Sequence, residues 1–237
     1  MKPTDGLIWG WNRRYSPSMR HVPELTAMRK PGRPRHPVAR STLLSIAREV
    51  FAETGYGAAS LTEIARRAGL RKASLFHHFP TKEALYLEAL SEMVRELHGH
   101  IVEANAPGGS FADRLDRLGE ILVRYLGDHR HAARLALREL VDGGPFVSGP
   151  GRAAVEATLD ATVAFLEEGA PRSGWHRNAA RHLALSIIGL HLFYFAAPAL
   201  AGYTVGSDIF TAAAVEERAG AVRAHVQRLM AVGERME

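Results

Sequence analysis

Residues 60–82, SLTEIARRAGLRKASLFHHFPTK, predict two short helices joined by a tight turn, and this pair constrains the fold more than any other stretch. Ser60 is a favourable N-cap, and Glu63 three residues later completes a capping-box pattern, so the first helix is expected to begin at about Leu61. Its apolar face consists of Leu61, Ile64, Ala65 and Ala68. Gly69 follows directly and can take the positive φ that ends helices, so the chain turns there before a second helix.

The second helix of this pair is expected to begin at about Arg71 and is polar along most of its surface. Leu75 and Phe79 are its apolar residues at i and i+4, so they form its buried edge. The outward-facing residues combine cations, a methyl group and rings, which suits a helix that lies in the major groove of DNA. These residues are Arg71, Lys72, Ala73, Phe76 and His77. The alternative is an ordinary helical hairpin with a solvated basic face.

The residues on both sides of this pair favour the DNA-binding interpretation. An amphipathic helix is expected over residues 39–54 and ends at the turn formed by residues 55–57. Another helix, capped by Thr81, is expected to run to about Asn105. Three packed helices followed by a connecting helix predict an N-terminal three-helix DNA-binding domain with a helix-turn-helix, joined to a helical body.

This part of the chain resembles the N-terminal signature of the TetR family of transcriptional repressors. The matching stretches are AREVFAETGY (47–56), SLTEIARRAGL (60–70) and LFHHFPTKEAL (75–85), and the match extends over residues 40–90. Phe76 stands where the family most often has Tyr, so it lacks the hydroxyl that commonly bonds a DNA phosphate. Its ring can still pack on a sugar or a thymine methyl group.

The resemblance also implies a division of labour among the DNA contacts. The residues expected to contact base edges are Lys72, Ala73, Ser74 and His77. Thr62 on the preceding helix is expected to help them, and Lys82 at the start of the connecting helix is expected to hold a phosphate. His78 lies at the rim of the second helix, where it can donate to phosphate. The alternative for all of these residues is a solvated polar face.

Residues 1–37 form a basic arm, because nine Lys or Arg residues and only two acidic ones lie among the first 40 positions. The arm lacks helical periodicity and is expected to be disordered in the free protein. Residues 29–35 (RKPGRPR) resemble an AT-hook core, in which Arg33 and Arg35 would enter the narrow minor groove of A·T-rich DNA. A solvated basic tail with general phosphate attraction is the other interpretation, and the sequence leaves both open.

The body, residues 83–237, is expected to be helical throughout. No window alternates as a strand does, and no internal repeat is present. Further helices are expected over residues 110–126, where Ser110 and Asp113 repeat the capping pattern, and over 130–141, 150–168, 178–196 and 212–230. The fold class is therefore all-α. Its three expected parts are the arm (1–37), the helix-turn-helix domain (38–82) and a regulatory and dimerisation domain (83–237).

The composition and motifs exclude several kinds of chemistry. The chain has no Cys, which excludes disulfides, thiolate metal sites and thiol catalysis. It has 12 His, but no pair has the i, i+4 spacing of a helical zinc site, so no metal site is predicted. No Gly-rich phosphate loop, nucleophile elbow or paired-carboxylate motif is present. We therefore predict no cofactor, no catalytic residue and no enzymatic activity.

Aromatic and His residues gather on and near the helix expected over residues 178–196. A mostly apolar pocket with a few polar partners would bind a small hydrophobic or aromatic molecule. The candidate ligand-binding residues are Met93, Tyr125, His191 and Tyr194. Plain core or a dimer seam is the alternative. Resemblance to the TetR family implies a homodimer in which the last two long helices of each chain form a four-helix bundle. It also implies a small-molecule effector that alters the spacing of the two DNA-binding domains, and the sequence does not identify this effector.

Residues 183–201 are the longest apolar run, but polar residues, a glycine and a proline interrupt it, so a buried helix is predicted rather than a membrane span. No signal peptide is recognised near the N-terminus, and a cytoplasmic location is expected. The predicted function is a sequence-specific transcriptional regulator: a dimeric repressor that a small molecule releases from a palindromic operator in double-stranded DNA. An architectural protein that coats DNA through its basic arm, with weak sequence preference, is the alternative.

Overall fold

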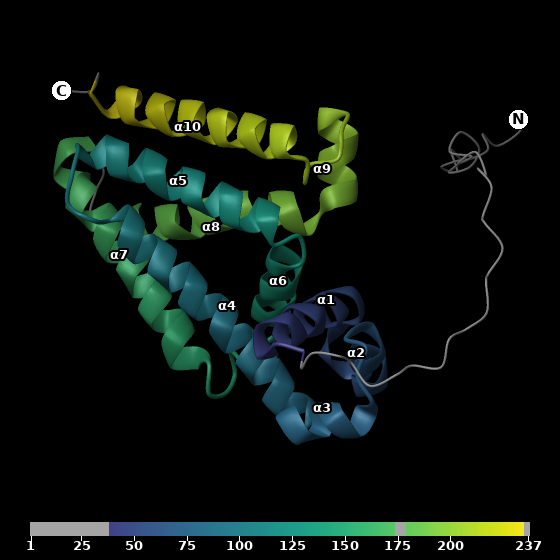
Figure 1. Cartoon of the computed structure of the whole chain (residues 1–237). Coiled ribbons are helices and arrows are strands. Elements are labelled where there is room, and N and C mark those ends of the chain that lie inside the picture. Colours follow the sequence, from purple (N-terminus) through teal and green to yellow (C-terminus); the bar gives the residue numbers. More distant parts are fainter. Residues whose placement is uncertain (1–37, 174–178, 235–237) are drawn as a thin grey trace, which may run out of the picture. The chain divides into compact units, whose positions relative to one another are not determined.

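The computed structural model describes residues 38–173 and 179–234, and all regular secondary structure within these ranges is helical (Figure 1). The helices are α1 (Arg40–Ala58), α2 (Leu61–Arg67), α3 (Lys72–His78), α4 (Lys82–Ala104), α5 (Phe111–Asp128), α6 (Ala132–Asp142), α7 (Arg152–Ser173), α8 (Ala179–Ala196), α9 (Pro198–Val205) and α10 (Ala212–Glu234). The all-α prediction is confirmed. The basic arm, with Arg33 and Arg35, lies outside the described residues.

Helices α1, α2 and α3 pack around a small apolar core. It contains Phe51 from α1, Ile64 from α2 and Leu75 from α3, each fully buried. The chain kinks within α1 at Gly55, whose φ of 79° lies in the left-handed region that glycine adopts at low cost. The sequence predicts that this helix ends at residue 54. In the structure the kink follows directly after that residue, and one further turn then continues to Ala58.

The N-termini of α2 and α5 carry the same sequence pattern but form different hydrogen bonds. At α5, Ser110 Oγ accepts from the Asp113 amide at 3.2 Å and the Ser110 amide donates to the Asp113 carboxylate at 2.7 Å, so this capping box is confirmed. At α2, Ser60 Oγ accepts from the amide two residues further on, at 3.2 Å. Ser60 is thus an N-cap, but the predicted hydrogen bond from its amide to the Glu63 carboxylate is wrong, because two arginines hold that carboxylate.

Helix α4 connects α1–α3 to the rest of the chain. It packs on α1, α5 and α7. Leu85, Ala89 and Leu90 of α4 belong to the same buried cluster as Phe51 of α1 and Phe195 of α8. The three N-terminal helices therefore share a continuous apolar core with the body, and α1 also packs on α6.

Helix α10 lies along α5, and two glycines on α5 let the helices approach closely (Figure 1). A Cβ at Gly127 would lie 2.6 Å from a methyl carbon of Val215, and a Cβ at Gly119 would lie 3.2 Å from one of Val222. Because interiors are close-packed, larger residues at these two positions would push α10 away from α5.

The structure corrects the prediction for residues 183–201. By length and composition alone, α8 is the one helix in the described ranges that could cross a membrane, yet only 22% of it is buried inside the chain. The expectation of a buried helix is therefore wrong for the chain by itself, and both Leu185 and Phe193 are more than half exposed. Helix α9 was not predicted, because Pro198 interrupts the apolar run; proline is in fact favoured in the first turn of a helix.

Candidate nucleic-acid interface and apolar cavity

Helix α3 is held by one buried edge and exposes the rest of its surface. Leu75 and Phe79 are at most 1% exposed. The exposed residues of α3 and its N-cap include all those predicted to contact DNA from this segment: Arg71, Lys72, Ala73, Ser74, Phe76, His77 and His78. Thr62, in the first turn of α2, is exposed as well. These eight residues are called the α3 surface below, and their types suit contact with base edges and phosphates.

The α3 surface carries an aromatic ring beside a cation. Phe76 is 40% exposed, and the Nζ atom of Lys72 lies 5.7 Å from the centroid of its ring. This is within the range of a cation–π contact. The ring and the ammonium group are therefore presented together, and the ring remains accessible to a sugar or a thymine methyl group.

Lys82 has a different environment from the other predicted DNA contacts. Its Nζ donates to the carbonyl oxygens of Tyr56, Gly57 and Ala59, at 2.8, 3.0 and 3.3 Å. An ammonium group has three donors, so these bonds occupy all of them. In this structure Lys82 ties the start of α4 to the end of α1. Its contact with a DNA phosphate stays a prediction.

An ion-pair cluster fixes α2 against α1. Arg67 binds three carboxylates, those of Glu53 at 2.7 Å, Glu63 at 2.8 Å and Glu49 at 3.1 Å. Hydrogen bonds from Arg66 and Arg67 hold the pKa of the Glu63 carboxyl down at about 2. The hydrogen bond from Arg67 likewise lowers the pKa of Glu53. Because α3 follows α2 after a short turn, this cluster also helps to orient the α3 surface.

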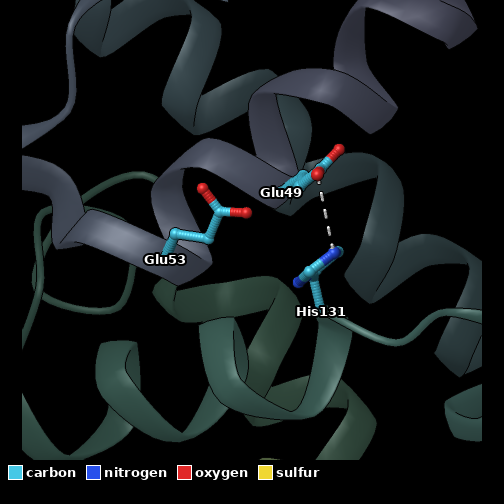
Figure 2. Close-up of side chains that lie close together, drawn as sticks. All are labelled: Glu49, Glu53 and His131. Carbon is cyan, nitrogen blue, oxygen red and sulfur yellow. Dashed lines mark ion pairs between the residues drawn. The ribbon is translucent and has the colours of Figure 1, made fainter. Parts of the chain in front are cut away.

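Glu49, Glu53 and His131 form a group of possible metal ligands that sequence reasoning missed (Figure 2). Their ligand atoms lie within 4.8 Å of one another, and His131 Nε2 is 4.0 Å from Glu49 Oε1. Burial lowers the pKa of His131, which favours the neutral ring that a metal needs. Both carboxylates already bind Arg67, however, and a metal ion would have to displace that guanidinium. The group is better explained by packing between α1 and α6, which are distant in sequence.

Glu139 of α6 is a buried carboxylate that faces both α4 and the turn after α6. It accepts hydrogen bonds from the Tyr86 hydroxyl and from the amides of Phe146 and Val147, the amides at 2.7 and 2.8 Å. Burial, followed by the hydrogen bond to Glu139, raises the pKa of Tyr86, so its hydroxyl stays a donor. Tyr86 also packs on Phe51 of α1, with ring centroids 4.8 Å apart. Glu139 and Tyr86 therefore link α6 to α1.

An apolar cavity of about 140 Å³ lies among α4, α5, α6, α7 and α8. Most of its wall consists of Leu, Ile, Val, Met and Phe side chains, and its polar members are Glu139, Thr158, Thr162 and His191. Two of the predicted ligand-binding residues, Met93 and His191, line this cavity. A mostly apolar wall with a few polar groups is typical of a small-molecule site.

Tyr125 and Tyr194, the other predicted ligand-binding residues, do not line this cavity. The Tyr125 hydroxyl donates to Glu96 at 2.9 Å, and its ring stacks on that of His129 with centroids 4.4 Å apart. The Tyr194 ring lies 4.2 Å from the guanidinium carbon of Arg218. Burial raises the pKa of both tyrosines. Both residues have packing roles here, and contact between either of them and a ligand stays a prediction.

Sequence reasoning missed Glu139, Thr158 and Thr162 as cavity residues. The two threonines are four residues apart on α7, a spacing that could have indicated a polar stripe on its inner face. Glu139 gave no comparable signal, because a Glu within a helix is almost always exposed unless it is paired.

Comparison with known proteins matches residues 43–89 to the family described as bacterial regulatory proteins, tetR family. The HTH-type transcriptional activator FasR of Mycolicibacterium smegmatis is 30% identical over 151 residues, which cover 64% of this chain and 68% of FasR. The HTH-type transcriptional repressor KstR2 of Rhodococcus jostii is 41% identical over 69 residues, which cover 29% of this chain and 34% of KstR2.

Solved structures of similar fold extend the match into the body. The TetR family transcriptional regulator PfmR from Thermus thermophilus aligns with a TM-score of 0.61 and 20% identity, covering 82% of this chain and 97% of PfmR. The ketosteroid transcriptional regulator KstR2 of Mycobacterium tuberculosis aligns with a TM-score of 0.57 and 21% identity, covering 66% of this chain and 81% of that one. At these identities the similarity shows a shared fold, with an N-terminal helix-turn-helix and a C-terminal helical domain.

Proposed function

This chain belongs to the TetR family of DNA-binding transcriptional regulators, and we propose that it is a homodimeric repressor which a small apolar molecule releases from its operator. Regulators of this family are not enzymes; they bind operator DNA and small-molecule effectors, typically as dimers, and are generally cytoplasmic. In the proposal, residues 38–82 bind DNA, and residues 83–237 form the regulatory and dimerisation domain. The basic arm, residues 1–37, adds minor-groove contacts through Arg33 and Arg35.

The observation that carries the proposal is the α3 surface, which is polar, exposed and held by a fully buried edge. Leu75 and Phe79 fix the helix to the core, so the backbone positions from which the outward side chains extend are held in place. A recognition helix needs this rigidity, because base readout depends on hydrogen bonds at defined places along the groove. The α3 surface therefore reads sequence, and residues at its rim hold the phosphate backbone.

Dimerisation is supported by the apolar residues that α8 exposes. Leu185, Leu190 and Phe193 are 64%, 37% and 58% exposed in the single chain. Large apolar side chains exposed along one helix favour packing against another apolar surface. In the proposal, α8 and α10 of two chains form a four-helix bundle. The two α3 helices of such a dimer must fit successive major grooves about 34–36 Å apart, on a palindromic operator.

Release by a ligand is supported by the position of the apolar cavity. Helix α4 begins beside the DNA-binding domain and contributes Leu90, Met93 and Leu97 to the cavity wall. Glu139 belongs to the same wall and holds the hydroxyl of Tyr86, which packs on α1. A ligand that shifts α4 or α6 would therefore move both DNA-binding domains of the dimer. A coupling free energy of about 1–3 kcal/mol is enough to weaken DNA binding about 5–150-fold.

Selection of bound fragments from a random DNA pool tests the DNA-binding part of the proposal. We expect a palindrome with two half-sites, bound at least about 10³-fold more tightly than unrelated DNA at physiological salt. Enrichment of A·T-rich DNA without a fixed sequence would instead support the architectural alternative, in which the basic arm dominates binding.

Calorimetric titration of candidate ligands, with and without operator DNA, tests release. Linkage is reciprocal, so operator must weaken the binding of a true effector by the factor by which the effector weakens operator binding. A compound with equal affinity in both titrations is not the effector, however tightly it binds.

A further inference from the structure

The apolar cavity among α4, α5, α6, α7 and α8 has the size of one small hydrocarbon. Its volume is about 140 Å³. An apolar protein cavity of about 150 Å³ stays dry and binds benzene, so the space suits a molecule of about six to eight carbons. Of the described residues that line the cavity, only Leu140 is exposed, at 45%, and its side chain is apolar as well. The wall is therefore apolar even where it reaches the surface.

Three of the four polar residues of the wall have no proton to offer a ligand. The Thr158 hydroxyl donates to the Ala154 carbonyl oxygen at 2.8 Å, and the Thr162 hydroxyl donates to the Thr158 carbonyl oxygen at 2.9 Å. Each hydroxyl has a single proton, so both are used within α7. The Glu139 carboxylate is an acceptor, and it receives hydrogen bonds from the Tyr86 hydroxyl and from two backbone amides.

His191, the fourth polar residue, offers no donor either. Its Nδ1 lies 2.7 Å from the Ile187 carbonyl oxygen, so the proton on Nδ1 is donated there. The other ring nitrogen, Nε2, is fully buried and lies by the carbonyl of Gly119, which lines a second cavity between α5, α8 and α10 and not this one. Burial lowers the pKa of the His191 ring, which keeps the ring neutral and leaves Nε2 without a proton.

Resting on the proposed ligand-binding role of the body, we propose that the effector is a compact hydrocarbon of about six to eight carbons, without a carbonyl, ether or charged group. The side chains described in the wall offer no hydrogen-bond donor. A group that can only accept hydrogen bonds would therefore lose its hydration inside the cavity without replacement, and a charged group would lose more. The cavity thus selects its ligand by excluding acceptor groups rather than by forming a hydrogen bond.

The test uses ethylbenzene and anisole, titrated calorimetrically into the full-length protein. The two molecules have the same shape, but anisole has an ether oxygen in place of one methylene group, and that oxygen can only accept hydrogen bonds. The ratio of their affinities is compared with the ratio of their partition coefficients between water and hexadecane, a solvent without hydrogen-bonding groups. We expect the two ratios to agree. A donor in the wall would favour anisole over this reference by about two- to tenfold, the effect of one net hydrogen bond.

Two variants of wall residues calibrate this comparison. Met93→Gln brings an amide donor into the wall at similar length and should raise the relative affinity for anisole by about two- to tenfold. Thr162→Val removes a hydroxyl whose proton is already used, so it should leave the ratio as it is in the wild type. A wild-type ratio as favourable to anisole as that of Met93→Gln overturns the inference, as does a fall in the relative affinity for anisole in Thr162→Val.

A third variant tests whether the hydrocarbon binds in this cavity. Ala136 lies in the wall, and Ala136→Leu, or Ala136→Val if the larger side chain prevents folding, fills part of the space and should weaken ethylbenzene binding. An unchanged affinity would show that ethylbenzene binds elsewhere, and it overturns the inference. Benzoate at neutral pH should bind more weakly than either neutral molecule, and tighter binding of benzoate would also contradict the selection against charge.

The outcome is separable from the proposed function. If ethylbenzene binds as expected but leaves operator affinity unaffected, the selection against acceptor groups holds and release by this ligand class fails. If ethylbenzene does not bind while the protein still selects a palindromic operator, the inference is overturned and the DNA-binding function stands.

Discussion

Helices α3 and α8 both leave much of their surface outside the core of the single chain, but they expose opposite chemistry. Among the residues of α3 only Leu75 is buried, and the rest of its surface combines a lysine, two imidazoles, a serine hydroxyl and a methyl group with one aromatic ring, that of Phe76. Helix α8 buries Ala180, Ala184, His191 and Phe195, and it exposes leucines and a phenylalanine. An exposed polar face with a firm anchor can meet DNA, whereas an exposed apolar face marks a site of interaction with another apolar surface.

The two regions also differ in how charged groups are used. Around α2 and α3, Arg67 and three glutamates form a partly exposed cluster that holds two helices together. In the body, Glu139 is a buried carboxylate whose oxygens accept three hydrogen bonds. The region around α3 therefore exposes its polar groups, whereas the body buries polar groups in the wall of an apolar cavity.

The largest expected effect distinguishes a residue that anchors α3 in the core from a neighbouring residue that contacts DNA. Leu75→Ala removes a fully buried side chain and should lower the free energy of unfolding by about 2–5 kcal/mol. Phe76→Ala, the neighbouring and exposed position, should change it by less than about 0.5 kcal/mol yet reduce operator affinity. Chemical denaturation and DNA titration of both variants measure the two quantities. Equal stability losses would show that the α3 surface is not independent of the core.

The next effect concerns the link between the cavity wall and α1. Tyr86→Phe removes the hydroxyl that donates to the buried Glu139 carboxylate, and should cost about 1.5–3 kcal/mol of unfolding free energy. It should also reduce the factor by which an effector weakens operator binding. Tyr125→Phe is a matched control, because Tyr125 donates to Glu96 away from this junction. If both variants reduce the factor by which an effector weakens operator binding to the same extent, Tyr86 does not link the cavity to the DNA-binding region.

Much of the DNA-binding region could be predicted because local chemistry specifies it. The N-cap at Ser60, the helix end at Gly69 and the apolar pair Leu75 and Phe79 each act within a few residues, so a local pattern is sufficient. The hydrogen bond from the Ser60 amide to the Glu63 carboxylate was predicted wrongly because the pattern takes no account of competing partners. Arg66 and Arg67 offer that carboxylate charged donors, which form stronger hydrogen bonds than an amide does.

The body could be predicted only as a set of helices, because its site depends on contacts between distant segments. An apolar stripe looks the same whether it faces core, cavity or a second chain, so the exposure of α8 was not predicted, and an apolar pocket was predicted with only part of its lining. Met93 and His191 line the cavity, whereas Tyr125 and Tyr194 face other neighbours. The direction in which a side chain points depends on the packing of α4, α5 and α8, which no local pattern determines.

The third prediction distinguishes the cation expected to contact a base, Lys72, from the one expected to hold a phosphate, Lys82. Lys72→Ala should weaken operator binding by about 1–3 kcal/mol and relax the preference at one position of each half-site, if Lys72 contacts guanine. Lys82→Ala should weaken binding to all sequences alike and reduce the salt slope by about one unit. DNA titrations at several salt concentrations decide this. Lower stability with an unchanged slope would instead assign Lys82 to the contacts it makes with Tyr56, Gly57 and Ala59.

The smallest expected effect tests whether the exposed cluster around Arg67 contributes to stability at all. The pKa of Glu63 is lowered from 4.5 to about 2 by hydrogen bonds from Arg66 and Arg67. Because the folded state holds the ionised form, the stabilisation from Glu63 is fully present above pH about 4.5 and is lost as the pH falls towards 2. Glu63→Gln should therefore be less stable than the wild type at neutral pH, by an amount that shrinks over this window. Glu156→Gln on α7 is the control, since Glu156 pairs with one arginine at an exposed position. Denaturation curves from pH 7 to pH 2 measure both differences, and a Glu63 difference that does not depend on pH would mean that its charge has no part in holding α2 against α1.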